Sequence, residues 1–240
     1  MPDNKTNNKI VSVVIAAYNE EPRIANVLNA LKNHPYVHEV IVVDDCSKDK
    51  TSAVAAGFGV NVVRNEHNLG KTMSVKKGID LAKGEVIALL DADLIGITAG
   101  DLTKLMKPVV EGEYDWTISL RSNSWIWMKW VKMDWVSGER VVRKELLADP
   151  LIWSRPEVGF GLETLMNMSL LNKKTKFQSV YLANLKTERK ADKFGFFVGW
   201  YKDFKMVFKI FSVLWPGGVI AQFVRMAILN EKYKNEKLSS

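Results

Sequence analysis

The stretch Glu85–Gly96 reads Glu-Val-Ile-Ala-Leu-Leu-Asp-Ala-Asp-Leu-Ile-Gly. Its apolar run is typical of a strand buried inside a parallel sheet. Asp91 and Asp93 follow this run, at the strand end where open α/β sheets bind their ligands. Side chains two residues apart on an extended segment point the same way, so this pair favours Mg²⁺ or Mn²⁺ completed by substrate phosphates. From this stretch alone, a solvated turn after a core strand is an equal alternative.

Three more apolar runs precede this strand, and helical patterns separate them. We expect strands at Val11–Ala16, Val40–Val43, Val60–Val63 and Val86–Leu90, and helices at Ile24–Leu31, Thr51–Ala56 and Thr72–Ala82. Regular alternation of strand and helix predicts a mainly parallel sheet with helices on its faces, an α/β fold of Rossmann-like architecture.

The alternation becomes irregular after residue 100. The patterns predict helices at Asp101–Glu111, Ser137–Leu147 and from about Gly159 through Leu171, and strands at Trp116–Leu120 and Phe177–Leu182. We assign residues 1–193 to one domain, whose regular half ends at about residue 95.

The tail, residues 194–240, differs in composition. Its aromatic residues from Phe197 to Trp215 recur at helical spacing, and we expect Pro216-Gly217-Gly218 to break that pattern before a second apolar stretch, Val219–Leu229. Neither half reaches the roughly 20 apolar residues that a membrane span requires. A basic amphipathic helix with aromatic residues is typical of a bilayer interface. A helical hairpin packed on the sheet, or a homodimer contact, is the alternative for this appendage.

Composition limits the partners and the compartment. The chain has 34 basic and 27 acidic residues, a formal net charge of +7, which favours anionic partners. No recognised nucleic-acid-binding pattern is present, so we expect no nucleic acid partner. Cys46 is the single cysteine, which excludes an intramolecular disulfide. The start, Met1–Lys9, is polar and lacks the apolar core of a signal peptide, so we expect a cytoplasmic protein.

Two familiar phosphate-binding patterns are excluded. A P-loop requires a glycine five residues before Gly70, and Asn65 occupies that position. The segment Gly57-Phe58-Gly59 lacks the third glycine of a dinucleotide fingerprint, which disfavours a nicotinamide enzyme.

Four motifs follow one another in the first half of the chain, namely Val11–Glu20, Val42–Thr51, Asn65–Lys71 and Asp91-Ala92-Asp93. In this order they resemble the motifs of family 2 glycosyltransferases with the GT-A fold, in particular the polyprenyl-phosphate glycosyltransferase and dolichyl-phosphate mannose synthase-like group, and the last matches the Asp-X-Asp signature. The resemblance implies a nucleotide-binding half at about 10–95 and an acceptor half at about 96–193. Cys46 stands where a glycine is more usual. The resemblance covers about the first 95 residues and is weaker beyond them.

The resemblance implies transfer of a sugar from a UDP- or GDP-linked donor with the help of Mg²⁺ or Mn²⁺. Asp93 would bind the metal directly, and Asp91 would contact the ribose or reach the metal through water. The other residues that would contact the nucleotide are Ala17, Tyr18, Glu20, Asp45, Lys71 and Ala92. The chemistry fits, because a cation stabilises the charge that develops on a diphosphate leaving group.

The acceptor side rests on fewer residues. Glu163 occupies the position resembling the acidic motif near the acceptor, and it is our candidate general base, with a helix N-terminal charge partner as the equal alternative. Arg140 and Arg143 could bind an acceptor phosphate, or form a solvated basic face of the expected helix. Many relatives carry a late metal-ligating histidine, whereas His34, His38 and His67 are all early here.

Several functions stay open at this point. The first is transfer to a lipid acceptor such as a polyprenyl phosphate, by a protein peripheral on the cytoplasmic face of the membrane. The second is transfer to a soluble phosphorylated or hydroxyl acceptor, with the tail used for dimerisation. A nucleotidyltransferase and a non-catalytic sugar-nucleotide or membrane adaptor are alternatives from other classes.

Overall fold

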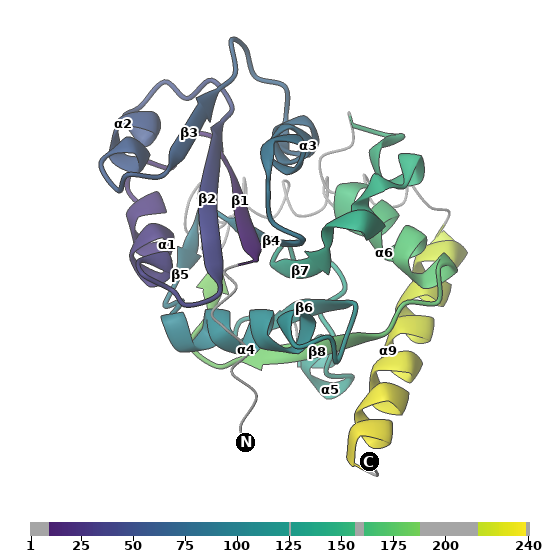
Figure 1. The fold of residues 1–240 in the computed structure, drawn as a ribbon. Helices are drawn as coiled ribbons and strands as arrows, with labels where there is room; N and C mark the ends of the chain where they lie inside the picture. The colour runs from purple at the N-terminus through teal and green to yellow at the C-terminus, as the bar shows by residue number, and fades with distance from the viewer. Residues whose placement is uncertain (1–9, 125, 157–160, 188–215, 239–240) are drawn as a thin grey trace.

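The computed structural model describes residues 10–124, 126–156, 161–187 and 216–238 (Figure 1). The first half alternates regularly, with β1 (Val11–Ala17), α1 (Ile24–Leu31), β2 (Val37–Asp44), α2 (Thr51–Ala56), β3 (Asn61–Arg64), α3 (Lys71–Leu81) and β4 (Val86–Asp91). Every strand and helix predicted here is confirmed, with ends that move by a few residues.

The second half contains shorter elements. They are β5 (Leu94–Ile95), α4 (Ala99–Val110), β6 (Trp116–Arg121), α5 (Ile126–Trp130), β7 (Arg140–Arg143), the 3₁₀ turns η1 (Lys144–Ala148) and η2 (Pro150–Trp153), α6 (Gly161–Asn172), β8 (Phe177–Leu182), β9 (Lys186–Thr187) and α9 (Pro216–Leu238). Helix α4 begins two residues earlier than predicted, because Thr98 and Asp101 form a reciprocal capping box at its start.

The main sheet has the strand order β3-β2-β1-β4-β7-β6-β8. Strand β7 runs antiparallel to its neighbours β4 and β6, and the other neighbouring pairs are parallel. A second small sheet pairs β5 with β9. The predicted fold class, a mixed and mainly parallel sheet flanked by helices, is confirmed.

Helices cover both faces of the sheet. Apolar residues of α1 and α4 pack with alternate sheet residues such as Val13 and Ala88 to form one core cluster. Residues of α3, α6 and α9 pack on the other face, around Ile87 and Trp116. Strands β1 and β4 are buried almost throughout, as expected for parallel strands covered on both sides.

The helix predicted over Ser137–Leu147 is wrong. Residues 140–143 form the strand β7, and only the following turn η1 is helical in the 3₁₀ sense. Val141 and Val142 are both fully buried, one in the core cluster on each face of the sheet, as strand residues are. β-Branched residues favour such a position, which overrides the helical spacing of the apolar residues.

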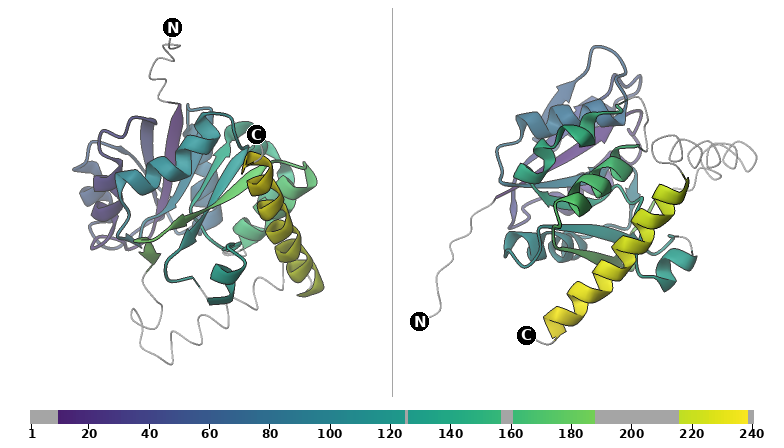
Figure 2. Two further views of the ribbon diagram at one scale, coloured as in Figure 1. Left: turned by 90° about the horizontal axis from the view of Figure 1, so that it is seen from below. Right: turned by 90° about the vertical axis from the view of Figure 1, so that its right-hand side faces the viewer.

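The C-terminal helix α9 lies along the outside of the domain (Figure 2). Pro216 is the first residue of this helix, where proline is tolerated, and the predicted apolar stretch Val219–Leu229 lies within it. Val219 and Met226 are buried in the core cluster of the α6 face. The predicted aromatic stripe before Pro216 lies outside the described residues. Among the residues that are described, no helix combines the length and apolarity that crossing a bilayer requires.

Candidate functional site

The residues predicted to bind the sugar donor meet where the neighbouring strands β2, β1 and β4 end, which is one edge of the sheet. Strand β1 lies between β2 and β4, with Ala17 opposite Asp44 and Ala16 opposite Asp91. Because these strands are parallel, their carboxyl ends open on the same side. The start of α3 at Lys71 adjoins this edge through its contact with Asp91.

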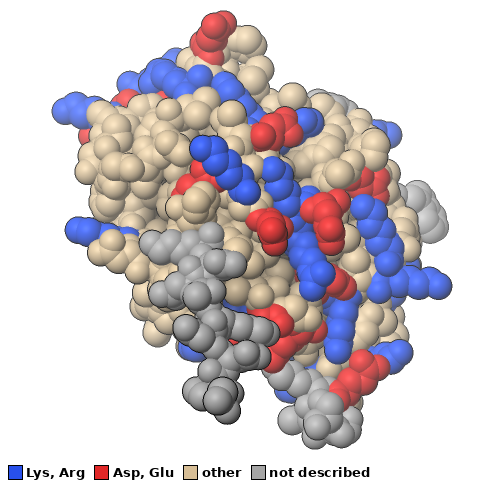
Figure 3. All heavy atoms as spheres, in the orientation of Figure 1, with Lys and Arg blue, Asp and Glu red and all other residues tan. Residues whose placement is uncertain are grey.

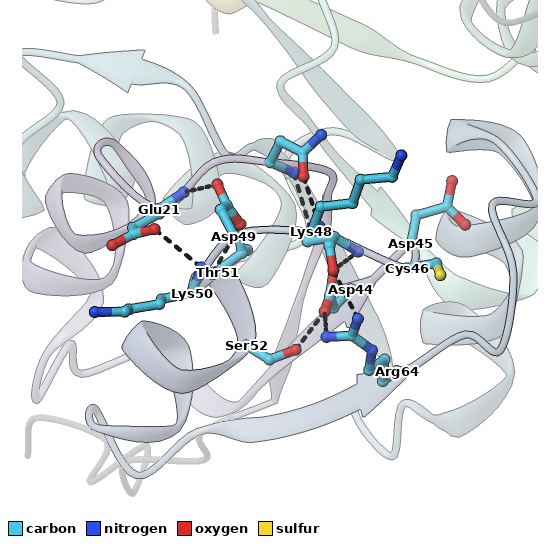
Figure 4. A network of polar contacts seen from close by, with 12 residues as sticks. Glu21, Asp44, Asp45, Cys46, Lys48, Asp49, Lys50, Thr51, Ser52 and Arg64 are labelled. Carbon is cyan, nitrogen blue, oxygen red and sulfur yellow. Dashed lines mark hydrogen bonds and ion pairs between the residues drawn. The ribbon is translucent and has the colours of Figure 1, made fainter.

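The two aspartates at the end of β2 are held by neutral donors and one arginine (Figure 4). Asp44 is fully buried and accepts hydrogen bonds from the Ser47 backbone, the Ser52 hydroxyl and Arg64. Asp45 points away from that group and accepts from the backbone N–H groups of Leu69 and Gly70, each at 2.8 Å, and from the Asn65 amide at 2.9 Å. Asp45 therefore fixes the turn that leads into Lys71, and its contact with a nucleotide stays a prediction.

Cys46 adopts a left-handed backbone conformation, with φ of 66°. Glycine reaches that region without steric cost, whereas side chains with a Cβ rarely adopt it. The preference for glycine at this position of the motif therefore follows from the shape of the turn after β2. The thiol lies 3.4 Å from the backbone oxygen of Glu66.

The loop after β1 is tied to the loop after β2. The backbone N–H of Asn19 donates to Ser47 at 2.9 Å, and that of Glu20 donates to Thr51 at 2.8 Å. The Glu20 carboxylate is paired with Arg23 at 2.5 Å. Tyr18 keeps 43% of its surface exposed beside these loops, which leaves its ring available to a base.

Lys71 joins the two halves of the domain. Its ammonium nitrogen lies 2.8 Å from Oδ1 of Asp91, at the end of β4, and 2.9 Å from Oε1 of Glu163, in the first turn of α6. Burial opposes the charged form of Lys71, but the two carboxylates outweigh it and raise its pKa. Burial likewise opposes the charged form of Asp91, and Lys71 with Arg121 lowers its pKa overall. The predicted donor carboxylate and the predicted base thus share one cation.

A small cavity lies beside this ion pair. Its volume is about 10 Å³, room for about one water, between Lys71, Asp91, Glu163 and apolar residues of α3 and α6. Oε2 of Glu163 is buried and has no hydrogen-bond partner among the described residues. Gly138 packs directly on Asp91, since a Cβ at position 138 would lie 2.6 Å from Oδ2 of that carboxylate.

The Asp-X-Asp signature continues past the end of β4. Ala92 is buried and Asp93 is half-buried in the turn between β4 and β5. Among the described residues, no group of three or more His, Cys, Asp or Glu side chains gathers as a metal cage. A donor set of Asp93 and Asp91 nevertheless fits Mg²⁺ or Mn²⁺, because such ions often take one or two carboxylates plus substrate phosphates.

Arg140 lies at this edge of the sheet but is buried. Its guanidinium donates to the backbone oxygens of Ser137 at 2.9 Å, Trp135 at 3.0 Å and Glu163 at 3.4 Å. It also donates to the side-chain amide oxygen of Asn167 at 2.5 Å. Burial lowers its pKa to about 10, with Glu163 among the carboxylates that oppose the shift. The structure thus uses Arg140 to join the start of α6 to the turn before β7, and not as part of a solvated helix face.

Arg143 is not brought to the same edge. It pairs with Val86 at the start of β4, whereas Arg140 pairs with Leu89 near the end of that strand. Arg143 faces Asp115 at 3.8 Å with 39% of its side chain exposed. The structure therefore separates the two predicted acceptor arginines because they belong to a strand instead of a helix.

A buried charge cluster next to Asp91 was missed by the sequence analysis. Arg121, at the end of β6, lies 3.4 Å from Asp134 and 3.7 Å from Glu139. These carboxylates raise the pKa of Arg121 against the effect of its burial. Glu139 also accepts from Ser119 and Ser137, each at 2.6 Å. The available signal was Arg121 itself, a charged residue that closes an apolar strand as Asp91 does.

Similar proteins were found by sequence. Dodecaprenyl-phosphate galacturonate synthase of Rhizobium johnstonii is 31% identical over 123 residues, which are 47% of this chain and 36% of that enzyme. Dolichyl-phosphate beta-glucosyltransferase of Mus musculus is 36% identical over 101 residues, 35% of this chain and 31% of that enzyme. The matched part of the chain covers no more than about half of the length of these curated relatives.

A solved structure shares the fold. Glucosyl-3-phosphoglycerate synthase of Mycobacterium tuberculosis, in complex with Mn²⁺, UDP and glucosyl-3-phosphoglycerate, superposes with a TM-score of 0.65 at 21% identity. The match covers 86% of this chain and 80% of that one. The family model "Glycosyl transferase family 2" matches residues 12–144, more than half of the chain. The chain belongs to glycosyl transferase family 2, and the resemblance that its four motifs carry is confirmed.

Proposed function

We propose that this protein is a metal-dependent glycosyltransferase that moves a sugar from a UDP- or GDP-linked donor to a lipid phosphate. The observation that carries the proposal is the Lys71 contact between Asp91 and Glu163. It unites a carboxylate of the donor signature with a buried carboxylate of the other half of the domain. Family membership and relatives named for polyprenyl and dolichyl phosphates support the same reading.

The donor would lie across the ends of β1, β2 and β4. Tyr18 supplies an exposed ring for the base, beside Ala17 and Glu20. Asp91 and Ala92 would face the ribose and diphosphate, and Asp93 with Asp91 would hold the divalent cation. When bound, the cation would stabilise the negative charge on the departing nucleoside diphosphate. The neighbour crystallised with Mn²⁺ and UDP supports this choice of ligands.

The transfer replaces one bond at the anomeric carbon of the sugar. An acceptor oxygen forms the new bond, and the bond to the diphosphate oxygen breaks with its electron pair leaving on the nucleotide. A hydroxyl acceptor must lose its proton, and Glu163 would take it. A phosphate acceptor is already a nucleophile, so Glu163 would then act only through Lys71, the cation that it holds. Glu163→Gln should therefore slow transfer to a hydroxyl by about 10²–10⁴, and transfer to a phosphate by much less.

A thermal-shift panel tests the donor assignment. The protein is heated with UDP, GDP, UDP-glucose or GDP-mannose, each with and without Mn²⁺. Ligands that bind only the folded state raise its Tm. We expect at least one nucleotide to raise the Tm only with Mn²⁺, and Asp93→Ala to remove that shift while the exposed control Asp80→Asn retains it. No metal-dependent shift with any nucleotide would refute the donor assignment.

The lipid acceptor draws support from the outer face of α9. Ile220, Val224 and Ile228 recur every fourth residue and are 62%, 46% and 64% exposed. Trp130 at the end of α5 is 83% exposed, and Lys132 beside it pairs with Glu231 of α9 at 3.6 Å. Exposed Trp and aliphatic side chains next to lysines fit the interface of an anionic bilayer. We therefore propose that the protein binds to a membrane surface, which we expect to be the cytoplasmic one.

Flotation with vesicles tests this placement. Removing α9 would expose the core against which Met226 packs, so substitutions are preferable to truncation. We expect the intact protein to float with vesicles that contain phosphatidylglycerol, and Ile220→Ser with Ile228→Ser to float much less. Lys234→Arg with Asn235→Ser, on the polar end of α9, is the control, because it keeps the charge of the helix. Equal flotation of both double variants would contradict a role for the apolar face.

A soluble phosphorylated acceptor is the second candidate. The structural neighbour whose complex holds glucosyl-3-phosphoglycerate favours it. In that case the outer face of α9 would serve a homodimer, and the chain would stay in solution with vesicles. Sedimentation of the intact protein and of the isoleucine double variant distinguishes the two candidates, because only a dimer contact would make the variant lighter.

A further inference from the structure

Lys71 is the residue through which the donor side and Glu163 touch. Its side chain is 34% exposed, whereas the side chains of Asp91 and Glu163 are 24% and 5% exposed. Two carboxylates held this close would repel each other without a cation between them. The ammonium of Lys71 is that cation.

The backbone position of Lys71 is fixed by contacts within the half of the domain that contains residues 10–95. Gly70 precedes it with φ of 82°, and the backbone N–H of Gly70 donates to Asp45. Asn65 donates to the same carboxylate and accepts from Lys77 at 2.8 Å. The start of α3 is therefore anchored, and the Lys71 side chain is the part that is able to change partner.

Asp91 offers little room for a second cation in this arrangement. Lys71 occupies its Oδ1, and Gly138 lies against the same carboxylate, where a Cβ at position 138 would come within 2.6 Å of Oδ2. A divalent ion bound through Asp91 must therefore take over from the ammonium. Glu163 has a second oxygen without a hydrogen-bond partner among the described residues, so it is able to keep Lys71 when Asp91 releases it.

We propose that Lys71 is a positioning residue that occupies Asp91 until the donor arrives and then stays with Glu163. The inference rests on the proposed function. Metal binding to Asp91 and the orientation of Glu163 are then linked through one side chain. Linkage is reciprocal, so removing Lys71 should change metal affinity even when no nucleotide is present.

Mn²⁺ binding to the full-length protein tests the proposal without any turnover. Free Mn²⁺ is measured by electron paramagnetic resonance during titration of the wild type, Lys71→Met and Lys76→Met. Lys76 lies on the same helix, where it pairs with the exposed Asp80 and lies over the Trp153 ring at 5.9 Å. It takes no part in the ion pair of Lys71, which makes it a matched control. We expect Lys71→Met to bind Mn²⁺ at least about fivefold more tightly than the wild type, since an opposing charge is gone. Lys76→Met should bind as the wild type does.

A gain of affinity separates this role from simple damage to the fold, which would lower affinity. Unchanged or weaker Mn²⁺ binding by folded Lys71→Met overturns the proposal. If Lys71→Met does not fold, the pair Glu163→Gln and Glu163→Gln with Lys71→Met replaces it, because one of the two facing carboxylates is then neutral. The same gain is expected between the members of that pair, and its absence has the same meaning.

A second titration separates the proposal from the donor assignment. UDP and GDP are titrated at saturating Mn²⁺ into the wild type and Lys71→Met. We expect the nucleotide Kd of Lys71→Met to stay within threefold of the wild-type value. A loss of nucleotide binding confined to the variant would make Lys71 a direct donor ligand and overturn its positioning role, with the proposed function intact. If the wild type itself binds neither nucleotide, the proposed function fails.

Discussion

Two parts of the same sheet edge treat their carboxylates differently. At the end of β2, Asp44 and Asp45 are surrounded mainly by backbone N–H groups, hydroxyls and an amide. At the ends of β4 and β6, Asp91 and its neighbours face Lys71 and Arg121.

This difference in partners distinguishes carboxylates that hold a loop in shape from carboxylates that are able to take part in binding and catalysis. Backbone N–H donors hold a loop in one shape, because they cannot move away from the carboxylate unless the backbone itself moves. Long cationic side chains can change partner, and several oxygens around them have no hydrogen-bond partner among the described residues, namely Asp134 Oδ1, Glu139 Oε1 and Glu163 Oε2. A buried oxygen that accepts no hydrogen bond is a place where a water, an ion or a ligand can supply one.

The largest expected effect is at the signature pair. Asp93→Ala and Asp91→Asn should each reduce sugar transfer by about 10³ or more, because both remove a carboxylate that would hold the cation. Release of UDP or GDP from the sugar nucleotide measures this. Asp80→Asn, on the exposed face of α3, should leave the rate unchanged. A non-catalytic adaptor would retain its cellular function with Asp93→Ala, which would contradict the enzyme assignment.

The next effect is on stability, and it contrasts two arginines of β7. Arg140→Met should lower the free energy of unfolding by about 3–5 kcal/mol, because it breaks a buried network that joins α6 to the sheet. Arg143→Met should change it by less than about 1 kcal/mol, since that arginine is a partly exposed ion-pair partner. Urea denaturation followed by circular dichroism measures both. Similar losses for the two variants would contradict the different roles of the two arginines.

A smaller effect is expected at the β2 end. Asp45→Ala leaves the N–H groups of Leu69 and Gly70 without their acceptor, which should cost about 1–3 kcal/mol of unfolding free energy. The same urea experiment applies. Lys48→Ala serves as the comparison, because Lys48 is exposed in the same loop and its described hydrogen bond comes from its backbone N–H. If Asp45→Ala abolishes nucleotide binding while leaving stability unchanged, then Asp45 is a nucleotide ligand and not an anchor.

The smallest effect is at Cys46. Its left-handed backbone favours glycine, while glycine also gains more freedom in the unfolded chain. Cys46→Gly should therefore change the unfolding free energy by less than about 1 kcal/mol, whereas the β-branched Cys46→Val should lower it by about 1–2 kcal/mol. Thermal melts of the two variants provide the measurement. A lower Tm for Cys46→Gly than for Cys46→Val would show that the thiol contact with Glu66 matters more than the backbone.

The regular half of the fold could be predicted because its signals are local. Runs such as Val86–Leu90 and the helical spacing of Ile24–Leu31 need no partner to be recognised, and both elements are found where they were expected. The strand at Arg140–Arg143 was missed because its partners, β4 and β6, lie far away in the sequence. Only the sheet decides its structure.

The site also has a part that local motifs predict and a part that depends on contacts between distant residues. The Asp91 end of β4 and the position of Glu163 near it were available from motifs, but Lys71 as the link between them was not. An ion pair between residues 71 and 163 leaves no periodic trace in the sequence. Arg121, Asp134 and Glu139 are charged residues inside apolar or aromatic segments, which pattern analysis treats as interruptions of a core.

Mixed charge also characterises the face that Figure 3 shows, where lysines and arginines are interspersed with aspartates and glutamates. The net charge of +7 is therefore not concentrated in one patch on that face. Electrostatic attraction of an anionic ligand to that face would depend on local groups and not on a broad positive surface.

Gly138 should make this site detectable in a mutational scan. A methyl group at this position would have to displace the Asp91 carboxylate. In a library that samples every substitution at every position, residue 138 should tolerate no other amino acid under selection for activity. Such a library would thus identify the neighbourhood of Asp91 from fitness values alone, without a substrate in hand.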